Sequence, residues 1–197
     1  MIDKETTWPD LFVVPQFFEQ RLCDAIAVEL KAAAGSSATV YGTASSGTID
    51  EMVRRTVRVK PSQETVALII QKLLACKDAV EKHFDVSLNE CEEPQFLRYR
   101  AGDFFVAHQD GNTPLIHDHS RFRKISAVIF LSAQSQDPSP DGYGGGALVL
   151  HGPYSGPEKR MPLTPEPGTL VCFRAETTHE VMPVTHGERF TIVSWYL

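Results

Sequence analysis

QFLRYRAGDFFVAHQD, residues 95–110, contains two short runs of aromatic and branched residues that are separated by a Gly-Asp break. Runs of this kind are typical of β-strands, and the glycine between them predicts a turn. The second run leads into His108 and Asp110. Because side chains two positions apart share one face of an extended segment, this imidazole and this carboxylate are expected to point at one place. The pair is either half of a metal site or a surface histidine beside a turn aspartate.

Similar runs recur at roughly ten-residue spacing from about residue 93 onward, which is typical of an all-β unit. They are ISAVIFLS (125–132), GALVLHG (146–152), GTLVCF (168–173), EVMPV (180–184) and RFTIVSWYL (189–197). The first half has an apolar strand closed by Pro15, an alternating strand MVRRTVRV (52–59) and two helices, at 19–34 and about 62–84. Their expected apolar faces are Leu22, Ile26 and Leu30 on the first helix, and Val66, Ile70, Leu73 and Val80 on the second. The expected fold is α+β, mainly β: a sandwich or jelly roll supported on one side by helices.

The bulk properties indicate one ordinary globular domain over residues 1–197, with helical support at about 16–85 and a jelly-roll core at about 94–197. A net charge of −6 argues against an electrostatic grip on nucleic acid. No signal sequence and no apolar stretch of about 18 residues is present, so we expect a cytoplasmic protein without a membrane span. The four cysteines form no C-x-x-C pair, so the sequence suggests neither a zinc knuckle nor a dithiol redox centre.

A metal site at His108 and Asp110 needs a third ligand, and His179 is the best candidate among the six other histidines. It stands where one apolar run ends and the next begins, whereas His117 and His119 flank Asp118 in a polar loop that would make a poor cage. Two histidines and one carboxylate form the facial triad of non-haem Fe(II) oxygenases, which leaves half of the metal open to other ligands.

HEVMPVTHGERFTIVSWYL, residues 179–197, is predicted to be a hairpin with THGE as its turn. In the returning strand Arg189, Thr191, Val193 and Trp195 share one face, by the period of two. A buried arginine usually has a carboxylate partner, and no acidic residue is obvious on this strand face. A dicarboxylic cosubstrate would supply the missing partner, with one end on the metal and the other held by the guanidinium.

Taken together, these motifs resemble the 2-oxoglutarate- and Fe(II)-dependent dioxygenases, most closely their prolyl 4-hydroxylase-like branch. The resemblance is carried by His108-x-Asp110, by His179 and by an arginine ten residues beyond it. FLRYRAGDFFVAHQD, ISAVIFLS followed by YGGGALVL, and HEVMPVTHGERFTIVSWY are similar to further family segments. The resemblance covers about residues 94–197, and the segment LFVVPQFFEQRLCDAI more loosely.

The resemblance implies a double-stranded β-helix that uses Fe(II), 2-oxoglutarate and O2, with ascorbate as a reductant. It implies decarboxylation of 2-oxoglutarate to succinate, coupled to hydroxylation of an unactivated C–H bond. In this reading His108, Asp110 and His179 are the catalytic metal ligands. Arg189, Tyr99 and Thr191 would hold the cosubstrate, and Arg123 and Trp195 would contact the substrate.

Some positions depart from the family pattern. Arg189 stands where many prolyl hydroxylases have lysine, and Phe130 stands where some relatives have a tyrosine, whose hydrogen bond Thr191 would have to replace. Nucleic-acid demethylases of the superfamily have a second arginine six residues after the first, and here that position is Trp195, which argues against a nucleic-acid substrate.

The substrate is left open by the sequence. A prolyl residue of a protein or peptide is one alternative, and a free amino acid or small metabolite is the other. Arg54, Arg55 and Arg123 are candidates for binding a substrate carboxylate, and the alternative is that they are solvated or protect a strand edge. The loops at 39–51, 111–122 and 134–146 carry no readable specificity signal, and the oligomeric state is equally open. A cupin-like metal enzyme that does not use 2-oxoglutarate is the alternative function.

Overall fold

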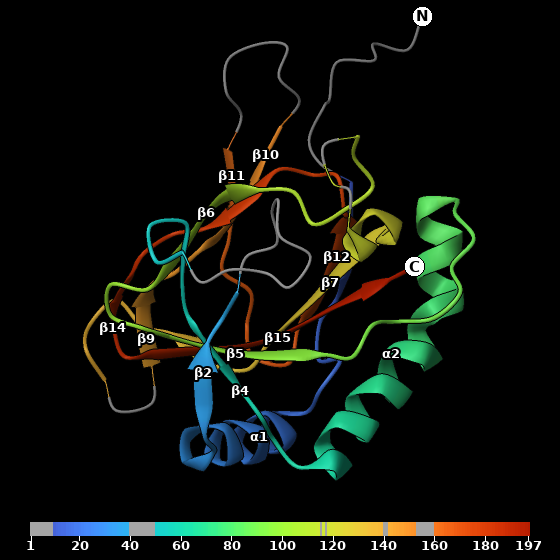
Figure 1. The fold of residues 1–197 in the computed structure, drawn as a ribbon. Helices are drawn as coiled ribbons and strands as arrows, with labels where there is room; N and C mark the ends of the chain where they lie inside the picture. Colours follow the sequence, from blue (N-terminus) through green and yellow to red (C-terminus); the bar gives the residue numbers. More distant parts are fainter. Residues whose placement is uncertain (1–9, 40–49, 115, 117, 140–141, 153–159) are drawn as a thin grey trace, which may run out of the picture.

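The computed structural model describes residues 10–39, 50–114, 116, 118–139, 142–152 and 160–197. Most of this part is β-structure, and two helices lie together at one side of it (Figure 1). The helices are α1 (Gln20–Ala32) and α2 (Gln63–Phe84). Within these ranges, neither helix is both long and apolar enough to cross a membrane. The mainly β architecture with helical support is the one that the sequence predicts.

The strands of the described residues form two large sheets and one small sheet. The seven-stranded sheet has the order β1 (Leu11–Val14), β12 (Leu170–Arg174), β7 (Ile125–Phe130), β15 (Glu188–Tyr196), β5 (Gln95–Arg100), β4 (Val57–Val59) and β2 (Gly35–Ser37). The five-stranded sheet has the order β11 (Arg160–Leu163), β10 (Leu148–His151), β13 (His179–Val181), β6 (Phe104–His108) and β3 (Arg54–Arg55). The small sheet has the order β14 (Val184–His186), β9 (Gly142–Gly145) and β8 (Ala133–Gln134).

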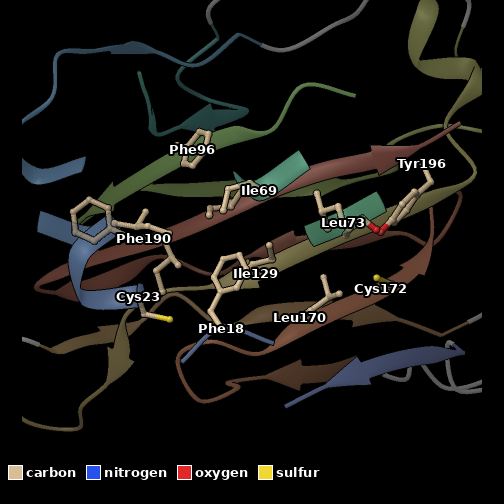
Figure 2. Packing of buried hydrophobic residues seen from close by; sticks show 14 of the residues in the cluster. Phe18, Cys23, Ile69, Leu73, Phe96, Ile129, Leu170, Cys172, Phe190 and Tyr196 are labelled. Carbon is tan, nitrogen blue, oxygen red and sulfur yellow. The ribbon is translucent and has the colours of Figure 1, made fainter. Parts of the chain in front are cut away.

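Strand β15 lies in the middle of the seven-stranded sheet, and its two faces meet different layers. Phe190, Ile192 and Tyr196 belong to a core that the sheet forms with the helices. Figure 2 shows Phe190 and Tyr196 in this core, together with Ile69 and Leu73 of α2. The alternate residues point towards the five-stranded sheet. The molecule therefore has three layers: helices, the seven-stranded sheet and the five-stranded sheet.

The two helices are joined at their ends by Glu29. Its carboxylate accepts hydrogen bonds from the backbone N–H of Ser62 and, at 2.7 Å, from the hydroxyl of Thr65. Ser62 is also the N-cap of α2, because its side chain accepts from the N–H of Thr65 at 3.3 Å. Burial alone would raise the pKa of Glu29, but these donors hold it below its ordinary value.

The buried face of α1 agrees with the sequence prediction at Ile26 and Leu30, which are fully packed. On α2 the prediction is right for Leu73 and Val80, but Ile69 fills the core in place of Ile70, which is only partly buried. Ile69 and Ile70 are adjacent, and both fit the apolar face of a helix with 3.6 residues per turn, so the sequence pattern alone does not choose between them.

Two predicted strand arrangements are wrong. The segment MVRRTVRV is not one strand, because β3 pairs with β6 in one sheet and β4 pairs with β5 in the other. The predicted hairpin around THGE is not a hairpin either, since β13 pairs with β6 and β10, whereas β15 pairs with β5 and β7. Each segment crosses between sheets, which the local turn signals do not encode. Of the predicted loops, residues 40–49, 115, 117 and 140–141 lie outside the described part of the chain.

Candidate active site

The three predicted metal ligands come together where two strands of the five-stranded sheet meet. His108 ends β6, and it is paired directly with His179, which begins β13. The register shifts after this pair, so that two residues of β6, Val106 and Ala107, oppose the single residue Glu180 of β13, and Phe105 faces Val181. This bulge places Phe105 and His108 close enough to stack, with ring centroids 3.6 Å apart. The backbone N–H of Asp110 donates to the carbonyl of Ala175 at 2.9 Å, which fixes the start of the following loop.

The ligand atoms of His108, Asp110 and His179 all lie within 4.8 Å of one another. Nε2 of His108 is 3.6 Å from Oδ1 of Asp110, and Nε2 of His179 is 3.4 Å from Oδ2 of Asp110. Neighbouring ligands of an octahedral ion with bonds of about 2.1 Å lie about 3 Å apart. The separations are therefore close to those of a shared metal ion, and the donor set fits Fe(II).

Both imidazoles are fixed in the tautomer that a metal needs. Nδ1 of His108 lies 2.8 Å from the carbonyl oxygen of Val106, and Nδ1 of His179 lies 2.9 Å from that of Thr177. A carbonyl oxygen only accepts, so each Nδ1 carries the proton and donates it. The Nε2 lone pairs are left to face Asp110, and the hydrogen bonds hold the rings in place.

Burial and charge keep His179 and Asp110 in their metal-binding protonation states. Burial, together with the neighbouring His108, lowers the pKa of His179 to about 4, so its imidazole is neutral at neutral pH. Burial alone would raise the pKa of Asp110, but interactions with His179 and His108 hold it well below its usual range. A neutral imidazole and an ionised carboxylate are the forms in which these two side chains coordinate a metal.

A fourth residue, which the sequence analysis missed, supports the carboxylate. The hydroxyl of Ser126 on β7 donates to Oδ2 of Asp110 at 2.7 Å, and Ser126 is completely buried. Ser126 lies on the same rung of the sheet as Trp195. The signal that could have identified it is that Ser126 is the one polar residue within the apolar run 125–131.

A cavity of about 610 Å³ between the two large sheets contains the three ligands. The predicted face of β15 is confirmed, because Arg189, Thr191, Val193 and Trp195 all line this cavity. Further lining comes from β5, β6, β7, β10 and β13: Gln95, Leu97, Tyr99, Phe105, Val128, Leu148 and Val181. A cavity of this size accommodates a small dicarboxylate together with part of a substrate.

Arg189 is buried without a carboxylate partner among the described residues. It is 1% exposed, its Nη1 donates to the Thr191 hydroxyl at 3.3 Å, and its buried Nε has no hydrogen-bond partner. The guanidinium carbon lies 5.1 Å from the ring centre of Tyr99 and 5.4 Å from that of Phe130. These contacts hold the cation in place, but they do not neutralise its charge. The three predicted cosubstrate residues, Arg189, Tyr99 and Thr191, thus lie together in the cavity wall.

The two predicted substrate residues also line the cavity, but they contact each other. The guanidinium of Arg123 lies 3.6 Å above the Trp195 ring. It is also held by Glu92, with Nε and Nη2 at 2.6 and 2.7 Å from the two carboxylate oxygens. Sequence reasoning missed Glu92, which precedes the first strand of the core. The charge of Arg123 is thus already paired within the protein.

In the polar loop after Asp110, the side chains of Asp118 and His119 make structural contacts and do not form a metal site with one another. Asp118 accepts hydrogen bonds from the N–H and hydroxyl of Ser120, and so caps the short helix η1 (His119–Phe122). The His119 ring packs edge-on against Phe122, with ring centres 5.6 Å apart. His117 lies outside the described residues.

Comparison with known proteins agrees with this geometry. The profile of the 2OG-Fe(II) oxygenase superfamily matches residues 94–197. A PKHD-type hydroxylase of Burkholderia cenocepacia is 32% identical over 79% of this chain and 66% of its own length. One of Phenylobacterium zucineum is 28% identical over 89% of this chain and 74% of its own length. The chain spans 66% of the Burkholderia relatives, slightly under two thirds.

Solved structures share the fold. A Pseudomonas putida prolyl-4-hydroxylase superimposes with a TM-score of 0.68 at 22% identity, covering 95% of this chain and 92% of the other. A Trichoplax adhaerens prolyl hydroxylase, in complex with a hypoxia inducible factor peptide fragment, has a TM-score of 0.70 at 15% identity, covering 96% and 84%. These similarities confirm the predicted jelly-roll fold class. With the superfamily profile matching more than half of its residues, the chain belongs to the 2OG-Fe(II) oxygenase superfamily.

Proposed function

We propose that this protein is an oxidoreductase: an Fe(II)- and 2-oxoglutarate-dependent dioxygenase, similar to prolyl 4-hydroxylases, that hydroxylates an unactivated C–H bond. The observation that carries the proposal is Arg189. A buried guanidinium without a carboxylate partner is costly, and it shares one cavity with a cluster of metal-ligating groups. A dicarboxylate that reaches from the metal to Arg189 satisfies both.

Each part of the site has a defined task in this proposal. His108, Asp110 and His179 would hold the iron through Nε2, a carboxylate oxygen and Nε2. Bound Fe(II), with O2 and 2-oxoglutarate, supplies oxidation of a C–H bond coupled to decarboxylation of 2-oxoglutarate to succinate. The protein orients the reactants and shields them from water.

Arg189 would form two parallel hydrogen bonds to the far carboxylate of 2-oxoglutarate. Thr191 accepts from Arg189, so its own hydroxyl proton stays available to donate to the same carboxylate. Tyr99 lies opposite Arg189 on the neighbouring strand and closes this end of the cavity. Phe130 places its ring beside the Arg189 guanidinium, where a tyrosine would have added a hydrogen-bond donor.

For the substrate we propose a prolyl residue of a protein or peptide, or a free amino acid or other small metabolite. The names of the similar proteins support the first alternative. The superfamily match favours an oxygenase over a cupin-like enzyme that does not use 2-oxoglutarate. We propose that residues 1–197 act as one domain; the cytoplasmic location and the use of ascorbate as a reductant stay predictions.

The proposal is tested by anaerobic titration of the metal-free protein with Fe(II) and then 2-oxoglutarate. We expect the visible charge-transfer band of Fe(II) chelated by an oxoacid. The band should be lost in His179→Ala and in His108→Ala, with a circular dichroism spectrum unchanged from wild type. Iron binding without the band would reject the cosubstrate and favour the cupin-like alternative.

A further inference from the structure

The charged side chains that line the cavity can be matched with their partners one by one. Asp110 and the two histidines face one another as the candidate metal ligands. Arg123 is paired with Glu92, and Asp118 caps η1. Arg189 is matched by the far carboxylate of 2-oxoglutarate in the proposed function. One further cation lines the cavity, and it is Arg54 of β3.

Arg54 has no carboxylate partner among the residues that the structure describes. Its Nη1 donates to the carbonyl oxygen of Thr39 at 3.0 Å, while its Nε is buried and makes no hydrogen bond. The hydrogen bond to the Thr39 carbonyl does not neutralise the positive charge. A half-buried guanidinium of this kind interacts with an anion more strongly than a fully hydrated one does.

The neighbours of Arg54 place it close to the proposed iron site. Arg54 pairs with Phe105 across the two strands, and its guanidinium carbon lies 4.7 Å from the centre of the Phe105 ring. The same ring stacks on His108, with centres 3.6 Å apart. The cation is therefore one aromatic ring away from a proposed metal ligand, and the strand pairing fixes this spacing.

We propose that Arg54 binds a carboxylate of the substrate, and so selects substrates that carry a negative charge a few bonds from the C–H group to be hydroxylated. This inference rests on the proposed function, because it assigns 2-oxoglutarate to Arg189. Arg123, the residue that the family resemblance suggests, is less suited to the task because Glu92 already occupies its guanidinium. The carboxylate could belong to a free carboxyl end or to an acidic side chain of a peptide.

The test is calorimetric titration of the anaerobic Fe(II)–2-oxoglutarate enzyme with two matched pairs of probes. N-acetyl-L-proline and its amide differ only in a terminal carboxylate. The blocked dipeptides acetyl-Pro-Asp-amide and acetyl-Pro-Asn-amide differ in an acidic side chain. In at least one pair we expect the acid to bind about tenfold more tightly than its neutral partner, as for a charge-assisted hydrogen bond.

Arg54→Gln should remove this preference and leave the affinity of the neutral partner unchanged. Arg55→Gln is the matched control, because it removes the same charge from the next residue of β3. Arg55 is exposed and lies over Phe104, 5.9 Å from the ring centre, and does not line the cavity. The Arg55→Gln variant should prefer the acidic probe over its neutral partner as strongly as wild type does.

The inference is overturned if wild type binds no acid more tightly than its neutral partner, or if the preference survives in Arg54→Gln. Loss of the 2-oxoglutarate band in Arg54→Gln would also overturn it, because the residue would then support the iron site. Absence of that band in wild type is a different failure, which would reject the proposed function and this inference with it.

Discussion

Replacing Arg189 by methionine is expected to stabilise the cosubstrate-free protein and to abolish 2-oxoglutarate binding. Burying an ion costs several kcal/mol. The hydrogen bond to Thr191 returns about 1 kcal/mol. The rings of Tyr99 and Phe130, at 5.1 and 5.4 Å, return about 1 kcal/mol each. Methionine keeps the packing without the charge, so the free energy of unfolding should rise by about 1–2 kcal/mol.

Thermal melts with and without 2-oxoglutarate, in the presence of redox-silent Mn(II), measure both effects. For a chain of 197 residues, a gain of this size raises Tm by about 3–6 °C. Cosubstrate at 100 times its Kd should raise the Tm of wild type by about 5–10 °C and should leave that of Arg189→Met unchanged. A lower Tm in the cosubstrate-free variant, or a shift with 2-oxoglutarate, would refute the reasoning.

Arg123→Met is the matched control, because it also removes a buried guanidinium that lies over an aromatic ring. Here the cation has a partner, and its loss leaves the largely buried carboxylate of Glu92 without one. We expect a loss of about 2–3 kcal/mol, reduced from that of a fully buried pair because Glu92 keeps some contact with solvent. The two methionine variants should therefore move Tm in opposite directions.

Three further substitutions test other parts of the structure. Ser126→Ala should weaken Fe(II) binding about 10–100-fold in a metal titration, because Asp110 loses the donor that orients it, and unchanged affinity would exclude that role. Glu29→Gln should lower the free energy of unfolding by about 1 kcal/mol at neutral pH, as for a lost helix cap. Folding lowers the pKa of Glu29, so the extra stability of wild type over Glu29→Gln should be lost as the pH falls through that pKa. The difference in Tm between the two proteins should therefore be smaller at pH 3 than at pH 7. Gly111→Ala places a Cβ against the Ser120 carbonyl and the Arg123 backbone, so Tm and metal affinity should both fall, and a wild-type melt would contradict the tight packing of this loop.

The metal cluster and the face of β15 could be predicted because both depend on local periodicity. His108 and Asp110 are two residues apart at the end of one strand, and Arg189 and Thr191 share a face by the same rule. The identity of the third ligand followed from its position between two apolar runs. These features need no knowledge of which strands pair.

The remaining features depend on long-range pairing, which a single sequence does not encode. The THGE segment has the composition of a hairpin turn, yet its flanking strands join different sheets. Glu92 and Arg123 meet across 31 residues, and neither position suggests the other. Arg54 and Arg55 were equal candidates for a substrate carboxylate in the sequence, and only the pairing of β3 with β6 shows that Arg54 is the one that lines the cavity.

Because the two faces of β15 meet different layers, substitutions on the two faces should have different effects. Phe190, Ile192 and Tyr196 belong to the core that holds the helices, whereas Arg189 and Thr191 face the cavity. In a saturation library scored separately for cellular protein abundance and for turnover, the phenotype should alternate with every residue. Even-numbered positions would lose abundance, and odd-numbered ones would lose turnover from protein that is still made. Because Arg189 and Thr191 would hold the cosubstrate, Val193 and Trp195 are the positions of this face to diversify when an altered substrate specificity is sought.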